Sequence, residues 1–310
     1  DFESQTLRDA IAAAYGLAAE NILVGNGSNE LLAAAIGTFV GPGTQVVIPR
    51  PTFTLYDKLV TVAGGSVTHV AIDPRTGLLP LEKMLVDNAV IIVCSPNNPT
   101  GGVLPQGGLQ KLLDTGSTVL FDRAYGDFAV CHPERSEGSR SDGASAASSA
   151  GDSSPSSRLG MTPLHDRLVT FSTFSKAWGL AGLRVGWLAS TAATAREIRK
   201  VKLPYSLNII SEAAAALALK NRAIRDANVK RIIAERERLF GEMKKLVEVF
   251  PTQANFITFR TKRPLFEDLC ARGILVRDVS SYPGLAGCLR VSVGSPEEND
   301  RFLAALKESA

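Results

Sequence analysis

The chain has 310 residues, of which 45% are hydrophobic and 21% are charged, a composition ordinary for a soluble globular protein of two domains. A net charge of +3 is too small to predict binding to nucleic acid or to a membrane surface. No apolar run approaches the roughly 18 residues of a membrane-spanning helix, and no signal peptide opens the chain. The cysteines at positions 94, 131, 270 and 288 form no CxxC pair, which argues against zinc or a disulfide framework and favours a reducing cytoplasm.

Strand-forming and helix-forming segments alternate through the first two-thirds of the chain. Residues 4–15 predict a helix that ends at Gly16. Short β-rich runs predict strands at residues 22–24, 45–48, 66–70, 89–94, 118–121, 168–171 and 183–189. Helical apolar spacing predicts helices at residues 31–40, 53–63, 79–86, 106–113, 191–202 and 207–219. This alternation predicts an α/β domain with a mostly parallel sheet.

Two later segments depart from this alternation. Residues 131–160 are rich in serine, alanine and glycine and contain almost no apolar side chains. Such a segment cannot bury enough surface to offset the entropy of ordering it. We predict a disordered surface insertion there, and the alternative is an interaction arm. Residues 222–248 predict a long amphipathic helix with a charged, solvated face.

A different composition follows Pro251. Strands are predicted at residues 254–259, 274–276 and 288–293, and helices at residues 264–271 and 296–307. Together these elements predict a small α+β domain. We therefore divide the chain into a large domain at residues 1–220 and a small domain at residues 221–310.

Polar residues follow several of the predicted strands. Asn98 and Asp122 come just after strand ends, and so do Gly27 and Ser28. Ligands of parallel sheets bind beyond the carboxyl ends of the strands. A glycine-bearing loop that opens onto a helix, with Ser28 or Asn29 as its N-cap, also suits a phosphate group. The alternatives are a helix start without a ligand, an Asx turn at Asn98 and a strand-end cap at Asp122.

The segment at residues 170–187 contains the residue that carries most of the functional interpretation. Lys176 has the hydroxyl side chains of Ser172, Thr173 and Ser175 as sequence neighbours and no acid, and Arg184 follows eight residues later. A lysine in such surroundings loses its proton more easily and acts as a nucleophile toward an aldehyde. Hydroxyl groups and an arginine suit a phosphate ester. Together they suggest pyridoxal 5′-phosphate (PLP), and the alternative is a strand-to-helix loop with an incidental lysine.

Other residues supply the remaining contacts that such a cofactor needs. Asp122 is suited to hold a pyridinium N–H and so keep the ring protonated as an electron sink. Tyr125 and Asn98 are candidates to donate to the ring oxygen, and Phe53 to stack on the ring face. Arg290 is a candidate to bind a carboxylate or a phosphate with both arms of its guanidinium.

Longer segments around these residues match a known family. They are Gly25-Asn-Gly-Ser-Asn-Glu30, Pro51-Thr-Phe53, Cys94-Ser-Pro-Asn-Asn-Pro-Thr-Gly101, Phe121-Asp-Arg-Ala-Tyr125, Ser172-Thr-Phe-Ser-Lys176 with Gly182-Leu-Arg184, Ala254-Asn-Phe256, Gly273-Ile-Leu-Val-Arg277 and Cys288-Leu-Arg-Val-Ser-Val-Gly294. Over nearly its whole length the chain resembles the PLP-dependent aminotransferases of fold type I, and within them the histidinol-phosphate branch. The resemblance implies a large domain with a mostly parallel seven-stranded sheet flanked by helices, and a smaller α+β domain.

The resemblance also implies a role for each site residue. Lys176 would form the Schiff base, Asp122 would pair with the pyridine nitrogen, and Phe53 would stack on the ring. Asn98 and Tyr125 would bond the ring oxygen. The cofactor phosphate would be held by Gly27, Ser28, Thr173, Ser175 and Arg184. The substrates would meet Asn98, Arg290 at the α-carboxylate of the amino donor, and Arg277 at the phosphate of histidinol phosphate.

The reaction implied by the resemblance is an amino transfer in histidine biosynthesis. Histidinol phosphate and 2-oxoglutarate would give imidazole-acetol phosphate and glutamate, with no metal. The family also implies a homodimer with the active sites at the interface.

Two departures from the family pattern leave alternatives open. Family members usually have an N-terminal arm with an Asn-Glu-Asn-Pro motif before an Arg-Tyr-Pro stretch, and this chain opens at Asp1, about where that stretch ends. Arg123 stands where the family commonly has glutamate. The alternatives are an inactive PLP-binding homologue without the arm, a threonine-phosphate decarboxylase and an aromatic amino acid aminotransferase. The paired Arg277 and Arg290 favour a phosphorylated substrate.

Overall fold

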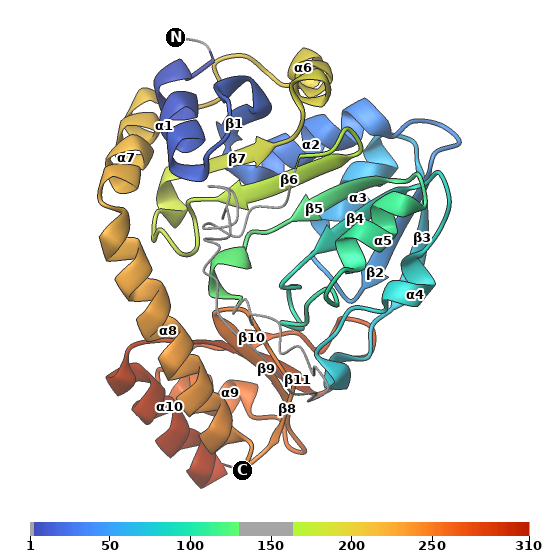
Figure 1. Ribbon diagram of the computed structural model, residues 1–310. Coiled ribbons are helices and arrows are strands. Elements are labelled where there is room, and N and C mark those ends of the chain that lie inside the picture. Colours follow the sequence, from blue (N-terminus) through green and yellow to red (C-terminus); the bar gives the residue numbers. More distant parts are fainter. Residues whose placement is uncertain (1–2, 130–163, 310) are drawn as a thin grey trace, which may run out of the picture.

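The computed structural model describes residues 3–129 and 164–309. Its strands form a seven-stranded sheet and a separate four-stranded sheet, joined by a long helix (Figure 1). The disordered insertion predicted at residues 131–160 lies outside the described residues.

The larger sheet is mostly parallel, as the sequence predicted. Its strands are β1 (Ile22–Asn26), β2 (Gln45–Arg50), β3 (Ser66–Ala71), β4 (Val90–Cys94), β5 (Thr118–Asp122), β6 (Leu168–Thr173) and β7 (Val185–Ala189). The strand order is β1-β7-β6-β5-β4-β2-β3. Strand β7 is antiparallel to both of its neighbours, β1 and β6, so these two strands run in the same direction as each other. The other neighbouring strands pair in parallel.

Helices cover both faces of this sheet. They are α1 (Gln5–Tyr15), α2 (Gly27–Phe39), α3 (Leu55–Val62), α4 (Leu81–Met84), α5 (Gly108–Asp114), α6 (Ala192–Val201) and α7 (Ile209–Lys220), with short 3₁₀ turns at Ala19–Asn21, Pro74–Thr76, Gly126–Phe128 and Ala181–Leu183. Helices α2, α3 and α6 share one apolar core with the sheet, whereas α1 and α7 pack on the opposite face with α4 and α5. Successive side chains of β1 point to opposite faces of the sheet. Leu23 packs in the core with α2, α3 and α6, whereas Ile22 and Val24 pack in the core with α1 and α7.

The smaller sheet has the order β10-β11-β9-β8 and is antiparallel. Its strands are β8 (Glu248–Val249), β9 (Phe256–Arg260), β10 (Arg277–Asp278) and β11 (Cys288–Ser292). Helices α8 (Arg222–Met243), α9 (Phe266–Ala271) and α10 (Pro296–Ser309) share one core with it. Figure 1 shows α8 running from the side of the larger sheet down to the smaller one.

Three predicted boundaries in these elements were wrong. The strand predicted at residues 274–276 is unpaired, because Ile274 and Val276 pack into the small core and pairing begins at Arg277. The helix predicted at residues 79–86 is reduced to α4, since Pro80 precedes it and Leu85 leaves the helical conformation with ψ 87°. Helix α8 ends at Met243 rather than residue 248, where the chain turns into β8.

The two sheets meet at a mixed apolar and polar junction. A small core at this junction joins Tyr125 and Phe128 from the large sheet's side to Val229 and Phe256 from α8 and β9. The fully buried Arg236 of α8 donates to the carbonyl oxygens of Phe128 (2.9 Å) and Ala254 (3.2 Å). These contacts hold the smaller sheet against the edge where the larger sheet's strands end. Within residues 3–129 and 164–309, no helix has both the length and the apolarity to cross a membrane.

Candidate active site

The polar residues predicted from the sequence converge on one edge of the larger sheet. Strands β1, β4, β5 and β6 end at this edge, and β7, which runs the other way, begins there. A cavity of about 290 Å³ opens at the edge and is lined by Ser28, Asn29, Phe53, Tyr56, Cys94, Asn98, Asp122, Ala124, Tyr125, Thr173, Ser175, Lys176, Arg184 and Arg290. Two predicted site residues, Gly27 and Arg277, lie outside this lining.

The glycine loop, residues 25–28, comprises the end of β1 and the start of α2, at one end of the cavity. The sequence suggested Ser28 or Asn29 as the N-cap, but α2 already begins at Gly27 and its N-cap is Asn26. Gly27 has a left-handed φ of 75°, and a Cβ on it would lie 2.6 Å from a guanidinium nitrogen of Arg184. A Cβ on Gly186 of β7 would lie 2.2 Å from the backbone nitrogen of Ser28. The two glycines therefore let a helix N-terminus lie directly against β7 and Arg184, which suits an anion.

Three predicted residues lie opposite the glycine loop. Arg184 donates through Nη1 to the carbonyl oxygen of Ala181 (3.1 Å) and more weakly to Oγ of Ser175 (3.5 Å). The hydroxyl of Thr173 donates to the carbonyl oxygen of Val185 (3.2 Å) and accepts from the N–H of Ser175 (3.1 Å). Thr173 thus mainly fixes the loop after β6, while Arg184 is exposed to the cavity with a left-handed φ of 53°. A non-glycine residue in this conformation at a ligand site stores backbone strain.

Asp122 ends β5 and is 4% exposed. Its Oδ2 accepts a hydrogen bond from the hydroxyl of Tyr56 (2.6 Å), and its Oδ1 accepts from the N–H of Ala124 (2.9 Å). Burial raises the pKa of the carboxyl, whereas these two donors and the charge of Lys176 pull it back down. A buried carboxylate supported by two neutral donors is suited to a cationic ring nitrogen.

Tyr56 and Cys94 were missed in the sequence. Tyr56 is fully buried, and its ring meets Phe53 edge-on with centroids 5.6 Å apart. Tyr56 lies in the first turn of α3, and nothing in the local sequence marks it as a site residue. Cys94 is the last residue of the buried strand β4, and burial raises the pKa of its thiol. Cys94 lies in an apolar run, so the sequence gives no sign that its side chain lines the cavity.

Lys176 follows β6 and is exposed to the cavity. Its Nζ lies 5.2 Å from the centroid of the Tyr125 ring. Protein atoms crowded around the ammonium lower the pKa of Lys176, and the charges of Arg290 and Arg184 lower it further. Loss of the proton yields the neutral amine that acts as a nucleophile or base. Tyr125 remains a hydrogen-bond donor at neutral pH, because burial raises the pKa of its hydroxyl.

The loop after β4 carries two asparagines with different environments. Asn97 is fully buried, donates to the carbonyl oxygen of Pro51 (2.9 Å) and accepts from Oγ1 of Thr52 (2.6 Å). Its role is to join this loop to the loop after β2. Asn98 faces the cavity, and its Oδ1 accepts from Nη1 of Arg290 (2.5 Å). This bond orients the amide of Asn98 from the smaller sheet.

Arg290 and Arg277 lie on one face of the smaller sheet. Their backbones pair across β10 and β11, and Arg290 also pairs with Thr258 of β9. Side chains of directly paired residues share a face, and Thr258 donates to the carbonyl oxygen of Pro99 in the loop after β4. The guanidinium of Arg290 stacks over the ring of Phe256 at 4.8 Å and lines the cavity, while Arg277 is exposed next to it. The charge of Arg277 contributes to lowering the pKa of Arg290, after burial as the main cause.

Comparisons with known proteins give similar sequences and a similar fold. A family model described as aminotransferase class I and II matches residues 1–306. The histidinol-phosphate aminotransferase of Aquifex aeolicus (strain VF5) is 35% identical over 328 residues, 100% of this chain and 83% of that protein. Histidinol-phosphate aminotransferase 1 of Archaeoglobus fulgidus is 34% identical over 313 residues, 99% of this chain and 88% of that protein. The crystal structure of histidinol-phosphate aminotransferase from Sinorhizobium meliloti in complex with pyridoxal-5′-phosphate has a TM-score of 0.80 at 25% identity, covering 100% of this chain and 83% of that chain.

Proposed function

The chain belongs to the class I and II aminotransferases, and we propose that it transfers the amino group of histidinol phosphate to 2-oxoglutarate with PLP as cofactor. The products are imidazole-acetol phosphate and glutamate, and the same steps can run in reverse. Relatives of 34–35% identity that span nearly the whole chain carry this activity in their names. The observation that carries the proposal is the pairing of Arg277 with Arg290 beside the Lys176 cavity.

The residues around the cavity fit PLP. The glycine loop, Ser175 and Arg184 offer N–H, hydroxyl and guanidinium donors for its phosphate. Asp122 offers a buried carboxylate for the ring nitrogen, and Phe53 offers a ring face. When bound, PLP supplies an aldehyde that takes up amino groups and a protonated ring that accepts electrons.

The chain's own residues then supply acid–base chemistry and orientation. Lys176 is the base positioned to move a proton at the carbon that bears the substrate's amino group, helped by its lowered pKa. Tyr125 and Asn98 offer donors at the side of the cavity nearest to Arg290. The hydrogen bonds that Asp122 accepts from Tyr56 and Ala124 favour its ionised form and oppose the effect of burial on its pKa.

The two arginines explain how one site accepts two different substrates. Glutamate carries an α-carboxylate that Arg290 can bind with both arms of its guanidinium, whereas histidinol phosphate has no carboxylate. Arg277 lies next to Arg290 on the same face and is exposed, so it is free to move toward the phosphate of histidinol phosphate. A phosphorylated substrate can thereby contact a second cationic side chain, that of Arg277.

The assignment is tested with the Arg277→Ala variant in steady-state turnover. We expect the KM for histidinol phosphate to rise about tenfold or more, because one charge-assisted contact is lost. The KM for glutamate in the reverse reaction should stay within twofold. The matched control is Arg263→Ala, an exposed arginine before α9. Equal effects on both substrates would contradict the role of Arg277.

The same assay separates the alternatives. A threonine-phosphate decarboxylase releases carbon dioxide from threonine phosphate and needs no keto-acid acceptor, and an aromatic aminotransferase prefers an aromatic donor without phosphate. An inactive homologue binds PLP and turns over none of these. Continuous glutamate production that requires both histidinol phosphate and 2-oxoglutarate supports the proposal over all three.

We also propose a homodimer, because four large apolar side chains between α6 and the start of α7 are exposed. Leu203, Tyr205, Ile209 and Ile210 are 68%, 78%, 81% and 72% exposed, a grouping that a monomer rarely leaves in water. We expect sedimentation equilibrium to give twice the chain mass, and Ile209→Glu combined with Ile210→Glu to give monomers. Leu275→Glu, on the small sheet's side and 84% exposed, is the control that should stay dimeric. A monomeric native chain would contradict the proposal.

Two further assignments remain proposals. We place the boundary between the large domain (1–220) and the small domain (221–310) at the junction of α7, which ends at Lys220, with α8, which begins at Arg222. A cytoplasmic location stays a prediction that rests on the cysteine pattern, and Cys94, Cys270 and Cys288 are free thiols. Limited proteolysis near residue 221 would test the domain boundary.

A further inference from the structure

Behind the glycine loop lies an acidic side chain that the proposed reaction does not use. Oε2 of Glu30, in the first turns of α2, accepts a hydrogen bond from the N–H of Asn26 (2.6 Å). A Cβ on Gly25 would lie 2.8 Å from this same oxygen. Glu30 therefore reaches back along its own helix and packs tightly against the loop. It provides an acceptor at the helix N-terminus, where backbone donors lack partners within the helix.

Glu30 also places a negative charge next to the site proposed for the cofactor phosphate. Its side chain is 17% exposed, so water screens the charge poorly and repulsion between Glu30 and a phosphate would act at higher strength than on the surface. A carboxylate in this position weakens phosphate binding unless a cation neutralises it.

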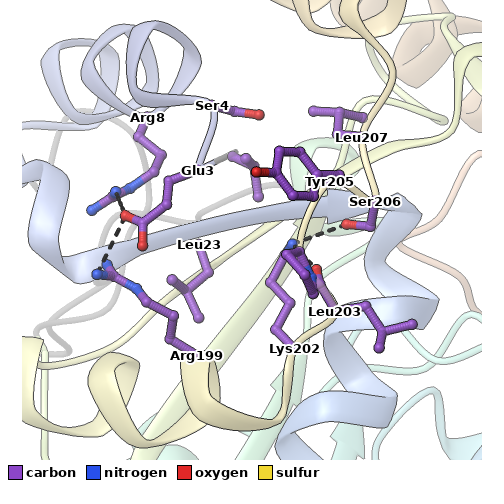
Figure 2. Close-up of a pocket in the computed structure, with 12 residues that line it drawn as sticks. Glu3, Ser4, Arg8, Leu23, Arg199, Lys202, Leu203, Tyr205, Ser206 and Leu207 are labelled. Carbon is purple, nitrogen blue, oxygen red and sulfur yellow. Dashed lines mark hydrogen bonds and ion pairs between the residues drawn. The ribbon is translucent and has the colours of Figure 1, made fainter. Parts of the chain in front are cut away.

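Lys202 provides that cation from a distant part of the chain. Its Nζ lies 3.7 Å from Oε1 of Glu30, and its side chain is 12% exposed. Figure 2 shows Lys202 with Nζ bonded to the carbonyl oxygen of Leu203 (2.9 Å) and Oγ of Ser206 (2.9 Å). These two acceptors fix the ammonium in place. Lys202 lies at the end of α6 and borders a second cavity, of about 150 Å³, beneath Tyr205.

We propose that Lys202 is a positioning residue for the cofactor phosphate, acting through Glu30. It neutralises the carboxylate that holds the glycine loop, so Asn26 keeps its hydrogen bond to Glu30 while the repulsion between Glu30 and the phosphate is reduced. This proposal rests on the proposed function, because it takes PLP as the ligand. It adds a residue that does not line the cavity and lies 172 positions from Glu30 in the sequence.

The test compares PLP with pyridoxal, which lacks the phosphate. Dissociation constants of both are measured on the full-length apoprotein by tryptophan fluorescence, for the native chain, Lys202→Met, Glu30→Gln and the double variant. We expect Lys202→Met to raise the dissociation constant of PLP about tenfold, because the charge of Glu30 is left uncompensated. The dissociation constant of pyridoxal should change less than twofold. Glu30→Gln keeps an oxygen for Asn26 and loses the charge, so it should bind PLP at least as tightly as the native chain.

The double variant gives the sharpest result. With the charge of Glu30 removed, loss of Lys202 should no longer matter, so the double variant should bind PLP within about threefold of the native chain. The matched control is Lys200→Met, an exposed lysine on α6 that pairs with Glu197. It should leave both constants unchanged.

Several outcomes would overturn the proposal. One is that Lys202→Met binds PLP as tightly as the native chain. Others are that Lys202→Met weakens the binding of PLP and pyridoxal equally, or that adding Glu30→Gln does not restore PLP binding. Each would show that Lys202 has a structural role or none. If Lys202→Met does not fold, Glu30→Gln decides alone, because weaker PLP binding in that variant contradicts the proposed repulsion. If the native chain binds no PLP, the proposed function fails first, and this proposal fails with it.

Discussion

Replacement of Lys176 by alanine is expected to lower the turnover number about 10⁴-fold, the upper range for loss of a positioned base. Among the described residues that line the 290 Å³ cavity, Lys176 is the only lysine. Crowding by protein atoms and the charges of Arg290 and Arg184 lower its pKa and so favour the neutral amine. Within residues 3–129 and 164–309, no other amine lines the cavity to take over the proton transfer. The measurement is steady-state glutamate production with histidinol phosphate and 2-oxoglutarate.

Phosphate binding distinguishes loss of the lysine from general damage to the fold. The Lys176→Ala apoprotein should retain binding of inorganic phosphate, because the glycine loop and Arg184 are unchanged. Lys200→Ala, at an exposed lysine paired with Glu197, is the control that should retain full turnover. A Lys176→Ala variant that retains more than a tenth of the native turnover would show that another base performs the transfer.

Replacement of Asp122 by asparagine is expected to lower turnover about 10³-fold, the scale of losing one buried electrostatic contact to the reacting group. The carboxylate is buried and holds its two hydrogen bonds from Tyr56 and Ala124. An uncharged amide of the same size cannot stabilise a protonated ring nitrogen. The measurement is again steady-state turnover, with Tyr56→Phe as a companion variant that keeps the carboxylate. Tyr56→Phe should lose less activity than Asp122→Asn.

The same substitution should stabilise the apoprotein at neutral pH. Burial raises the pKa of Asp122 above its ordinary value near 3.9. The folded state therefore binds this proton more tightly than the unfolded state, and the free energy of unfolding falls as pH rises from the ordinary pKa through the raised one. Asparagine does not titrate, so the advantage of Asp122→Asn over the native chain should grow across that interval and then stay constant.

Thermal unfolding of both apoproteins from pH 4 to pH 8 measures this difference. Asp73→Asn serves as the control with the opposite sign, because Arg75 lowers the pKa of that exposed carboxyl to about 2. The ionised carboxylate of Asp73 stabilises the fold above its ordinary pKa, and this contribution is lost as pH falls through the lowered pKa. Solvent screening keeps the contribution small. An Asp122→Asn apoprotein whose stability stays parallel to that of the native chain at every pH would contradict the burial argument.

Most of the site was predictable because it follows strand ends. Asp122 ends its strand, and Asn98 and Lys176 come a few residues after theirs. Parallel strands bring such ends to one edge. Arg184 was predictable from its motif, and the structure adds the reason for its position. It directly precedes β7, the antiparallel strand, whose start lies at the same edge as the ends of its neighbours.

The missed features depend on contacts between distant segments. The bond of Tyr56 to Asp122 joins residues 66 positions apart, and no local pattern marks it. Gly186 matters because its missing Cβ leaves room for Ser28, a contact set by the pairing of β7 with β1. Asn97 and Asn98 are adjacent and identical, yet only the folded loop shows that one is structural. Such pairings follow from the strand order, which composition and periodicity do not determine.

A single-turnover experiment measures the proposed amino transfer itself. The PLP-loaded chain is mixed with L-histidinol phosphate in the absence of any keto acid, and imidazole-acetol phosphate is quantified. We expect one equivalent of this product per chain, followed by continuous turnover once 2-oxoglutarate is added. A PLP-loaded chain that forms no keto product, or that releases product repeatedly without an acceptor, would contradict the proposed amino transfer.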